Sequence, residues 1–222
     1  MKTKLKVAVI GLGNIGTAVA TNLLKGNRSV IVADRKIEKA KALSQKLGSL
    51  SQPMEIPAAI KEADIIVFAV WFNAIKESLN KYATELSRKI IVDPSNPIAP
   101  DNKGGFKKIL GENESAGEIL SSLLPEDAKL AKALGTLGVA SLANAAFQKP
   151  EAVLFYATDD ISINADIEEL IRDNGFAPVR VGGLDQSIRL EVFGDLHEFG
   201  ALGKTVTASE AKEKVGEVSV AG

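Results

Sequence analysis

Short apolar runs alternate with stretches of helical periodicity over the first part of the chain. The runs are three to six residues long and lie at 7–10, 30–33, 65–70 and 90–92. Continuous apolar runs of this length are typical of strands buried on both faces of a sheet. Between them, apolar residues recur at helical spacing at 15–25, 37–47, 58–63 and 75–86, and Asn73 is the expected cap of the last segment. This alternation predicts an α/β fold with a doubly wound, mostly parallel sheet and helices on both faces.

The pattern changes after Asp93. Prolines and glycines interrupt the segment 93–111, which has little periodicity and leaves the carboxyl end of a predicted strand. Because ligands bind at that edge of such sheets, we expect this segment to be a lid rather than a disordered insert. Further helices are predicted at 116–124, 161–174 and 186–200, and further strands at 131–134, 152–157 and 179–181.

The end of the chain carries two weaker signals. Leu190 lies off the main apolar stripe of the predicted helix 186–200, which is consistent with a second covered face and a homodimer contact. Residues 205–222 are polar and unpatterned, so we expect a frayed tail there.

The segment Gly11-Leu12-Gly13-Asn14-Ile15-Gly16 joins the first predicted strand to the first predicted helix. The pattern G-x-G-x-x-G is common by itself, but here the next predicted strand ends in Asp34, as the dinucleotide-binding fingerprint requires. Gly11 permits a sharp turn, Gly13 lets the backbone approach a pyrophosphate, and Gly16 lets the helix pack closely on the strand. The alternative is a turn whose glycines serve packing only, and the strand–turn–helix context favours dinucleotide binding on a Rossmann fold.

Composition and charge narrow the functional classes. Lys+Arg 27 and Asp+Glu 28 give a net charge of −1, so neither nucleic acid nor a membrane surface is an expected partner. The absence of cysteine excludes thiolate chemistry, and a single histidine argues against a histidine-based metal site. No apolar run approaches the roughly 20 residues of a membrane span. The lysine-rich start is followed by the glycine turn rather than by a signal sequence, so a cytoplasmic location is expected.

Three further segments lie in an order that is found in a known family. They are Ala69-Val70-Trp71-Phe72, Asp93-Pro94-Ser95-Asn96-Pro97 and Lys132-Ala133-Leu134-Gly135-Thr136-Leu137. Together with the glycine turn, they make residues 5–203 resemble the coenzyme F420-dependent NADP reductase family, whose relatives include pyrroline-5-carboxylate reductase and the cytosolic domain of metalloreductases.

The resemblance implies hydride exchange between NADP or NAD and a small acceptor, either the deazaflavin F420, a flavin or another molecule. It places Asn96, Pro97 and Thr136 at the acceptor site, although no residue stands out as catalytic, and it places Phe72 beside the nucleotide. The expected cofactor-binding residues are Gly11, Gly13, Asn14, Ile15, Gly16, Asp34, Arg35, Lys36, Ala69, Val70, Trp71 and Asn96. We therefore expect a single NAD(P)-binding Rossmann domain at 1–204, with an acceptor region at about 94–204 and a polar tail at 205–222.

The chain departs from the family pattern at three places. Trp71-Phe72 replaces a proline–tryptophan pair, and Gly135 stands where asparagine or histidine is common, so an acceptor contact is in doubt. Asp34 precedes Arg35 where NADP-binding members usually have serine or asparagine. An ionised Asp34 would repel a 2′-phosphate, whereas Arg35 and Lys36 would attract it, so the sequence leaves NAD and NADP level.

His197 is the only imidazole and falls off the main apolar stripe of its predicted helix. A proton donor facing the acceptor and a structural histidine both stay open, and the structural role is favoured. Hydride transfer needs positioning and exclusion of water more than acid–base groups, so the shortage of candidate catalysts fits an oxidoreductase. The alternative function is a non-catalytic dinucleotide-binding module that senses redox state.

Overall fold

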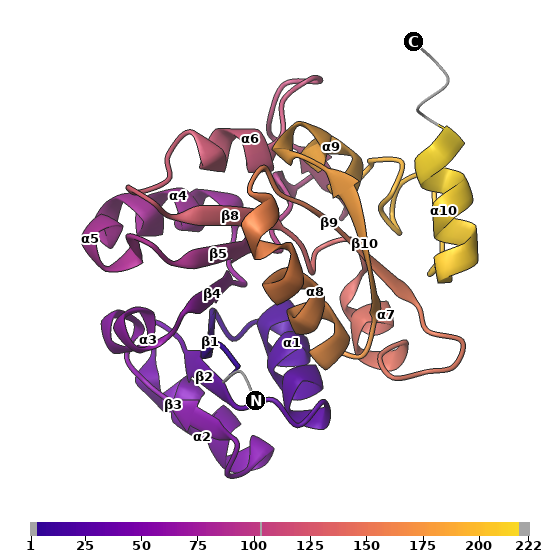
Figure 1. Cartoon of the computed structure of the whole chain (residues 1–222). Helices are drawn as coiled ribbons and strands as arrows, with labels where there is room; N and C mark the ends of the chain where they lie inside the picture. The colour runs from indigo at the N-terminus through magenta and orange to yellow at the C-terminus, as the bar shows by residue number, and fades with distance from the viewer. Residues whose placement is uncertain (1–3, 103, 218–222) are drawn as a thin grey trace.

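A computed structural model describes residues 4–102 and 104–217 of the chain. An eight-stranded sheet runs through it in the order β10-β9-β8-β5-β4-β1-β2-β3 (Figure 1). The strands of this sheet are β1 (Val7–Ile10), β2 (Val30–Ala33), β3 (Ser51–Pro53), β4 (Ile65–Phe68), β5 (Ile90–Asp93), β8 (Lys129–Lys132), β9 (Val153–Ala157) and β10 (Ala177–Gly182). All neighbouring pairs are parallel except β8 and β9, which share one antiparallel pair between Lys132 and Ala157.

Helices cover both faces of the sheet. Helices α1 (Asn14–Lys25), α2 (Ile37–Leu47), α7 (Val139–Asn144) and α8 (Asn164–Asp173) pack into the apolar core on one face. Helices α3 (Ile56–Glu62), α4 (Phe72–Lys81), α5 (Ala83–Leu86) and α6 (Ala116–Ser121) pack into the core on the other face. The predicted doubly wound, mostly parallel α/β fold is confirmed. The strand order reverses between β1 and β4, and that point is where ligands bind in such sheets.

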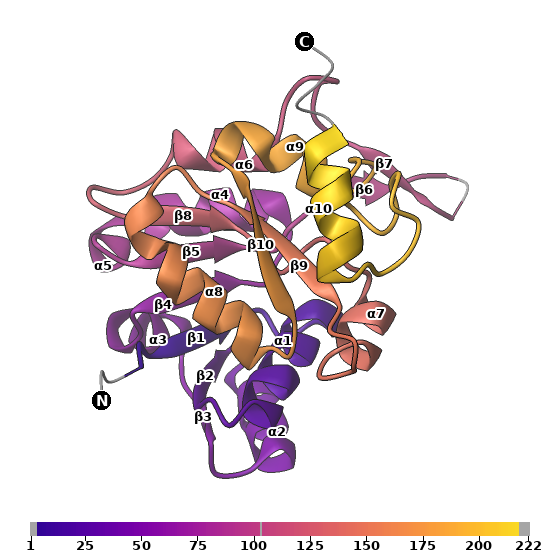
Figure 2. The ribbon, with the colours of Figure 1, turned by 45° about the vertical axis from the view of Figure 1, so that its right-hand side comes forward.

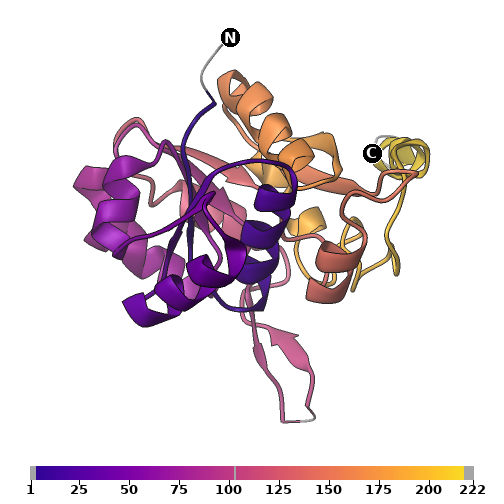
Figure 3. The ribbon, with the colours of Figure 1, turned by 90° about the horizontal axis from the view of Figure 1, so that it is seen from below.

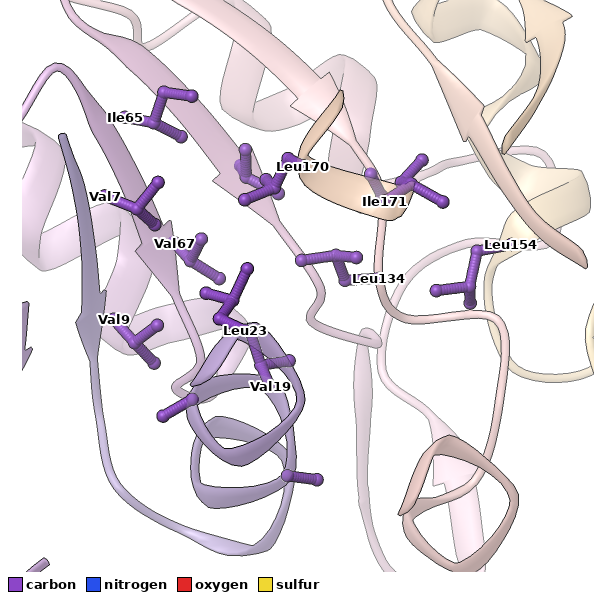
Figure 4. Packing of buried hydrophobic residues seen from close by; sticks show 14 of the residues in the cluster. Val7, Val9, Val19, Leu23, Ile65, Val67, Leu134, Leu154, Leu170 and Ile171 are labelled. Carbon is purple, nitrogen blue, oxygen red and sulfur yellow. The ribbon is translucent and has the colours of Figure 1, made fainter. Parts of the chain in front are cut away.

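The core follows from the alternation of side chains along each buried strand. Val7 and Val9 of β1 face the α1 side, whereas Ala8 and Ile10 face the α3 side. Figure 4 shows Val19 and Leu23 of α1 packed beside the strand residues of the first face. Because each central strand is apolar on both faces, its whole length is buried, as the continuous apolar runs predicted.

A third, smaller core lies at the end of the sheet formed by β9 and β10. It includes Leu190 of α9 (Ser187–Leu190), which follows the 3-10 turn η2 (Leu184–Gln186), and residues of helix α10 (Ala208–Glu217). Figure 2 shows α10 lying beside β9 and β10. The expected frayed tail is therefore wrong within 206–217, because Val206 and Ala211 are buried in this core. The rest of that expected tail, 218–222, lies outside the described residues. Leu190 belongs to the same core, so its off-stripe position reflects packing within the chain.

The expected lid is a hairpin followed by a loop. Strands β6 (Ile98–Pro100) and β7 (Phe106–Lys108) pair antiparallel and extend away from the main sheet (Figure 3). Sequence periodicity missed this hairpin because each strand has only three residues.

The predicted helix at 186–200 is also wrong. It ends at Leu190, and residues 191–200 form successive turns. Gly200 lies so close to Gly194 that a Cβ on Gly200 would be 1.8 Å from the carbonyl oxygen of Gly194. This close approach folds the segment back on itself, which a continuous helix cannot do.

Smaller differences concern the ends of elements. Helix α4 begins at Phe72 after Trp71, so Asn73 is not its cap, and the predicted helix 75–86 is divided at Tyr82. Strand β3 and helices α7 and α10 were not predicted from the sequence. The helix predicted at 161–174 begins with the 3-10 turn η1 (Ile161–Ile163). Among the described residues, the helices are all too short or too polar to cross a membrane.

Candidate active site

The glycine turn between β1 and α1 is fixed against the ends of the neighbouring strands. Gly11 has φ +92°, and its N–H donates to the carbonyl oxygen of Ala33 at 2.9 Å. A Cβ on Gly11 would lie 2.3 Å from Cγ1 of Val70, and a Cβ on Gly16 would lie 1.9 Å from the oxygen of Gly11. Both glycines are therefore required for close packing of the turn, as predicted.

Gly13 differs from the other two glycines of the turn because it faces open space. A Cβ on Gly13 would meet no atom within 4 Å. The residue caps α1 with an extended backbone and lines a groove of about 490 Å³. The groove is also lined by Leu12, Asn14, Thr17, Ala18, Thr21, Asn22, Lys25, Lys39, Val139 and Ala143. Packing alone does not require a glycine at this position, so the open space fits the approach of a pyrophosphate.

The first turn of α1 completes this anion-binding geometry. The helix is 12 residues long and carries no acidic residue in its first turn, so its positive dipole end is not neutralised. Asn14 is exposed beside the groove, and Ile15 is half-buried against the core. The turn therefore suits a phosphate group, while Ile15 contributes to packing.

Asp34 is held tightly at the end of β2. Its Oδ2 accepts the N–H of Leu12 at 2.9 Å, and its Oδ1 accepts the N–H of Lys36 at 3.2 Å. Nζ of Lys39 lies 3.6 Å from Oδ2. Burial by itself would raise the pKa of Asp34, but the two N–H groups and Lys39 together hold the pKa below its ordinary value. The carboxylate thus links β2 to the glycine turn and is ionised.

A second cavity of about 190 Å³ adjoins Asp34. It is lined by Asp34, Arg35, Glu55, Ile56, Pro57, Lys81 and Tyr82. Lys81 lies over the ring of Tyr82, with Nζ 5.0 Å from the ring centre. Arg35 and Lys36 are exposed, so both are accessible to a ligand. The cavity lies where the adenosine end of a dinucleotide is expected.

The segment after β4 divides between surface and core. Ala69 and Val70 are half-buried beside Gly11, and Trp71 is 59% exposed. Phe72 is buried in the core of the α3 side. Trp71 is therefore accessible for the expected nucleotide contact, whereas Phe72 packs in the core.

Asn96 connects three parts of the acceptor region. Its Oδ1 accepts the N–H of Val192 at 2.7 Å, and its Nδ2 donates to the oxygen of Gly135 at 3.4 Å. Pro97 is buried next to it. Thr136 is 2% exposed, and its Oγ1 has no hydrogen-bond partner within the described residues. An unpaired buried hydroxyl calls for an ordered water or another polar group, and the expected position of Thr136 at the acceptor site stays a prediction.

A glycine is required at position 135 for a steric reason that the sequence does not reveal. A Cβ on Gly135 would lie 2.4 Å from the carbonyl oxygen of Pro94. The loops after β5 and β8 thus touch at this point, and any larger residue would push them apart. The departure from the family pattern at this position is therefore a packing requirement of this chain.

His197 is a structural histidine. It is 1% exposed, its Nε2 lies 3.0 Å from the oxygen of Gly135, and its Nδ1 accepts the N–H of Phe199 at 2.9 Å. These partners require a neutral ring with the proton on Nε2. Burial lowers the pKa of His197 to about 4. The two ring nitrogens are engaged by the backbone, so the geometry does not support a proton donor to the acceptor.

A buried charge cluster lies beneath Asn96. Nζ of Lys132 is 2.7 Å from Oδ2 of Asp93 and 3.5 Å from Oε1 of Glu191, and it donates to the oxygen of Ser95. Glu191 also accepts the N–H groups of Ala116 and Gly117 at 2.8 and 3.2 Å. All three charged side chains are at most 2% exposed.

Burial and the neighbouring charges together set the pKa shifts in this cluster. Burial would lower the pKa of Lys132, but Asp93 and Glu191 raise it above its ordinary value, so the ammonium stays charged. Burial raises the pKa of Glu191. The cluster fixes the loop that carries Asn96 to the segment 191–200.

This cluster was not predicted from the sequence. Its members are widely separated in sequence, and charged residues in such positions are usually exposed. The only available signal was that Asp93 and Lys132 each lie inside a segment that resembles the family. Within residues 4–102 and 104–217, no three His, Cys, Asp or Glu side chains are placed to hold a metal ion.

Comparison with known proteins agrees with this geometry. A family model described as NADP oxidoreductase, coenzyme F420-dependent, matches residues 6–97. The chain is 28% identical to the metalloreductase STEAP3 of Rattus norvegicus over 186 residues, which are 84% of this chain and 36% of that protein. It is 28% identical to the F420-dependent NADP reductase of Methanocaldococcus jannaschii over 105 residues, which are 43% of this chain and 47% of that protein.

A solved structure resembles nearly the whole chain. The crystal structure of the hypothetical protein SMa0349 from Sinorhizobium meliloti matches with a TM-score of 0.79 and 28% identity, and the match covers 91% of this chain and 95% of that one. By contrast, the chain spans less than half the length of the two curated relatives. The resemblance to the coenzyme F420-dependent NADP oxidoreductase family, which the sequence motifs predicted, is confirmed, with the family model matching residues 6–97.

Proposed function

We propose that this chain is an NADP-dependent oxidoreductase that transfers a hydride between the nicotinamide and a deazaflavin, a flavin or another small acceptor. The observation that carries the proposal is the open position of Gly13, which lines a groove at the N-terminus of α1 although packing does not require a glycine there. The match of residues 6–97 to the family supports the same function.

The dinucleotide would extend along the carboxyl edge of the sheet. Gly11, Gly13 and Asn14 would bind its pyrophosphate, and Thr136 and Asn96 would border the nicotinamide. When bound, NADPH supplies a hydride, which is two electrons with one hydrogen nucleus, and the acceptor takes one further proton from water. No described residue of the acceptor site has to hold that proton, so the site acts by positioning the two reactants and excluding water.

We favour NADP over NAD because of the charges around Asp34. Its carboxylate is turned towards the glycine turn by Leu12 and is paired with Lys39, which weakens its repulsion of a phosphate. Arg35 and Lys81 line the adjoining cavity and supply positive charge for a 2′-phosphate.

The non-catalytic sensor is less well supported. It depended partly on the missing acceptor contact at Gly135, and the close approach of Pro94 now accounts for that glycine. A homodimer and a cytoplasmic location stay predictions.

The test is oxidation of NADPH and of NADH by the purified chain, with F420, FMN and no acceptor in parallel. We expect turnover with NADPH that requires an acceptor, and loss of turnover in Gly13→Val. Tight nucleotide binding without turnover on either acceptor would contradict transfer to a deazaflavin or a flavin, and would favour a different small acceptor or the sensor.

A further inference from the structure

Two phenylalanines are exposed on the segment that covers the acceptor region. Phe193 is 55% exposed and Phe199 is 61% exposed, and both belong to the turns at 191–200. Large apolar side chains that stay exposed next to a predicted site are frequently used for binding. Binding by these side chains is favoured if the backbone presents the two rings in a fixed position.

Several contacts hold the backbone of this segment. The N–H of Gly194 donates to the oxygen of Glu191 at 2.8 Å, and the guanidinium of Arg189 binds Asp195 with Nη2 2.9 Å from Oδ2. Leu196 is completely buried beneath the turns. A Cβ on Gly200 would lie 2.9 Å from the carbonyl carbon of Phe193. Because Gly200 directly follows Phe199, the backbone of the two exposed phenylalanines is close together.

Phe193 also has an unfavourable backbone conformation. Its φ of +75° lies in the left-handed region, which a glycine or asparagine adopts with less strain. Strained residues of this kind concentrate at binding and catalytic sites, where the side chain is needed. The turn itself does not explain why a phenylalanine stands there.

Both phenylalanines are attached close to the acceptor region. Asn96 binds the N–H of Val192, immediately before Phe193. The ring of Phe199 lies over Gly138, since its Cζ would be 2.5 Å from a Cβ there. Val139, the next residue, lines the groove that begins at Gly13. Phe193 is thus attached next to the residue that Asn96 contacts, and the ring of Phe199 lies beside the residue that precedes the edge of the predicted nucleotide groove.

We propose that Phe193 and Phe199 form the surface on which the planar ring system of the hydride acceptor stacks, and that they select planar heteroaromatic acceptors over aliphatic carbonyl or imine compounds. The inference rests on the proposed function and names the substrate class of that site. Aromatic side chains favour flat ring systems because offset stacking adds to the burial of apolar area. Because these contacts already hold the backbone, little ordering is required when the acceptor binds.

The test measures binding of F420 and of FMN through the quenching of their own fluorescence, which does not depend on turnover. Phe193→Leu and Phe199→Leu keep an apolar side chain but remove the flat ring, and Phe193→Tyr keeps the ring. Phe147→Leu is the matched control, because Phe147 is also exposed at 42% with φ +62° but packs against Gly175, after α8.

We expect each of the first two variants to raise the Kd for F420 and FMN by about tenfold, consistent with the loss of a stacking contact. Phe193→Tyr and Phe147→Leu should stay within about twofold of the unmodified chain, and the Kd for NADPH should not change in any variant. Sedimentation of each variant shows whether the same rings hold a second copy of the chain.

Two results would overturn this inference and leave the proposed function standing. The first is unchanged acceptor binding in both leucine variants of a chain that turns over. The second is dissociation of a dimer by these variants with unchanged acceptor binding, which would make the surface a subunit contact. If the unmodified chain neither binds nor reduces either acceptor, the proposed function fails together with the inference.

Discussion

Nζ of Lys132 lies 2.7 Å from Oδ2 of Asp93, and neither side chain is more than 2% exposed. The two residues come from the carboxyl ends of β8 and β5, which are adjacent in the sheet. The same ammonium contacts Glu191 and the oxygen of Ser95. One buried cation therefore ties together the loop that carries Asn96 and the segment that carries Phe193.

Removing this cation should destabilise the chain strongly. Lys132→Met leaves Asp93 and Glu191 buried without their partner, and the loss of one member of a buried pair costs about 3–5 kcal/mol. Urea unfolding measures the effect. Lys129→Met is the control, because Lys129 pairs with Asp160 at the surface, and such pairs contribute at most about 1 kcal/mol. Equal destabilisation by both substitutions would show that the buried cluster has no special importance.

His197 predicts a pH dependence of stability. The pKa of the folded state is about 4, whereas the unfolded chain has the ordinary histidine value of 6.5. As the pH falls below the unfolded value, the unfolded chain binds a proton that the folded chain does not, so stability is lost between these two pKa values. The total loss is about 3 kcal/mol at 1.36 kcal/mol per pKa unit.

Urea unfolding of the chain and of His197→Gln at several pH values measures this contribution. Because the chain has one histidine, the substitution should remove the histidine part of the slope and leave the carboxylate part. Identical slopes in the two proteins across this pH range would contradict the buried neutral ring.

The glycine turn offers a pair of substitutions with opposite consequences. Gly13→Val should change the free energy of unfolding by no more than about 1 kcal/mol, because its side chain meets open space, but it should abolish NADPH binding. Gly16→Ala should destabilise the chain by about 1–3 kcal/mol, because its Cβ would overlap with the oxygen of Gly11. Normal NADPH binding by a folded Gly13→Val chain would show that the fingerprint is not the pyrophosphate site.

We expect Asp34 to influence the choice between the two nucleotides. Asp34→Ser removes a negative charge beside Arg35, so the ratio of Kd values should shift towards NADPH. Glu38→Ser removes the same charge from the exposed side of α2, outside the cavity, and should leave the ratio unchanged. Titration of both variants with NADPH and NADH measures the shift, and equal ratios would show that Asp34 does not contact the ribose.

The first half of the fold follows directly from the sequence, because strands buried on both faces leave continuous apolar runs such as Ile65–Phe68. Short elements were missed. Strand β3 is Ser51–Pro53, which has no apolar run, and α10 is mostly polar, with Ala211 completely buried. The segment 186–200 has helical periodicity in its sequence, but its helix ends at Leu190 because Gly200 packs against Gly194.

The candidate site was predictable where local geometry dictates the residue type. The positions of Gly11, Gly13 and Gly16 in the turn follow from the spacing of three glycines. By contrast, the Lys132 cluster depends on strands that are distant in sequence, and the role of Gly135 depends on a backbone atom of Pro94. Such relationships appear only after the chain has folded.

Hydride transfer from NADPH to a ring held at the acceptor region can be followed directly by isotope transfer. The purified chain is mixed with F420 and NADPH that carries deuterium at the transferred position of C4. Because the new bond in reduced F420 is to carbon, the label does not exchange with water. We predict that one deuterium appears in the reduced deazaflavin. Reduction without the label, or no reduction of bound F420, would contradict hydride transfer to this acceptor.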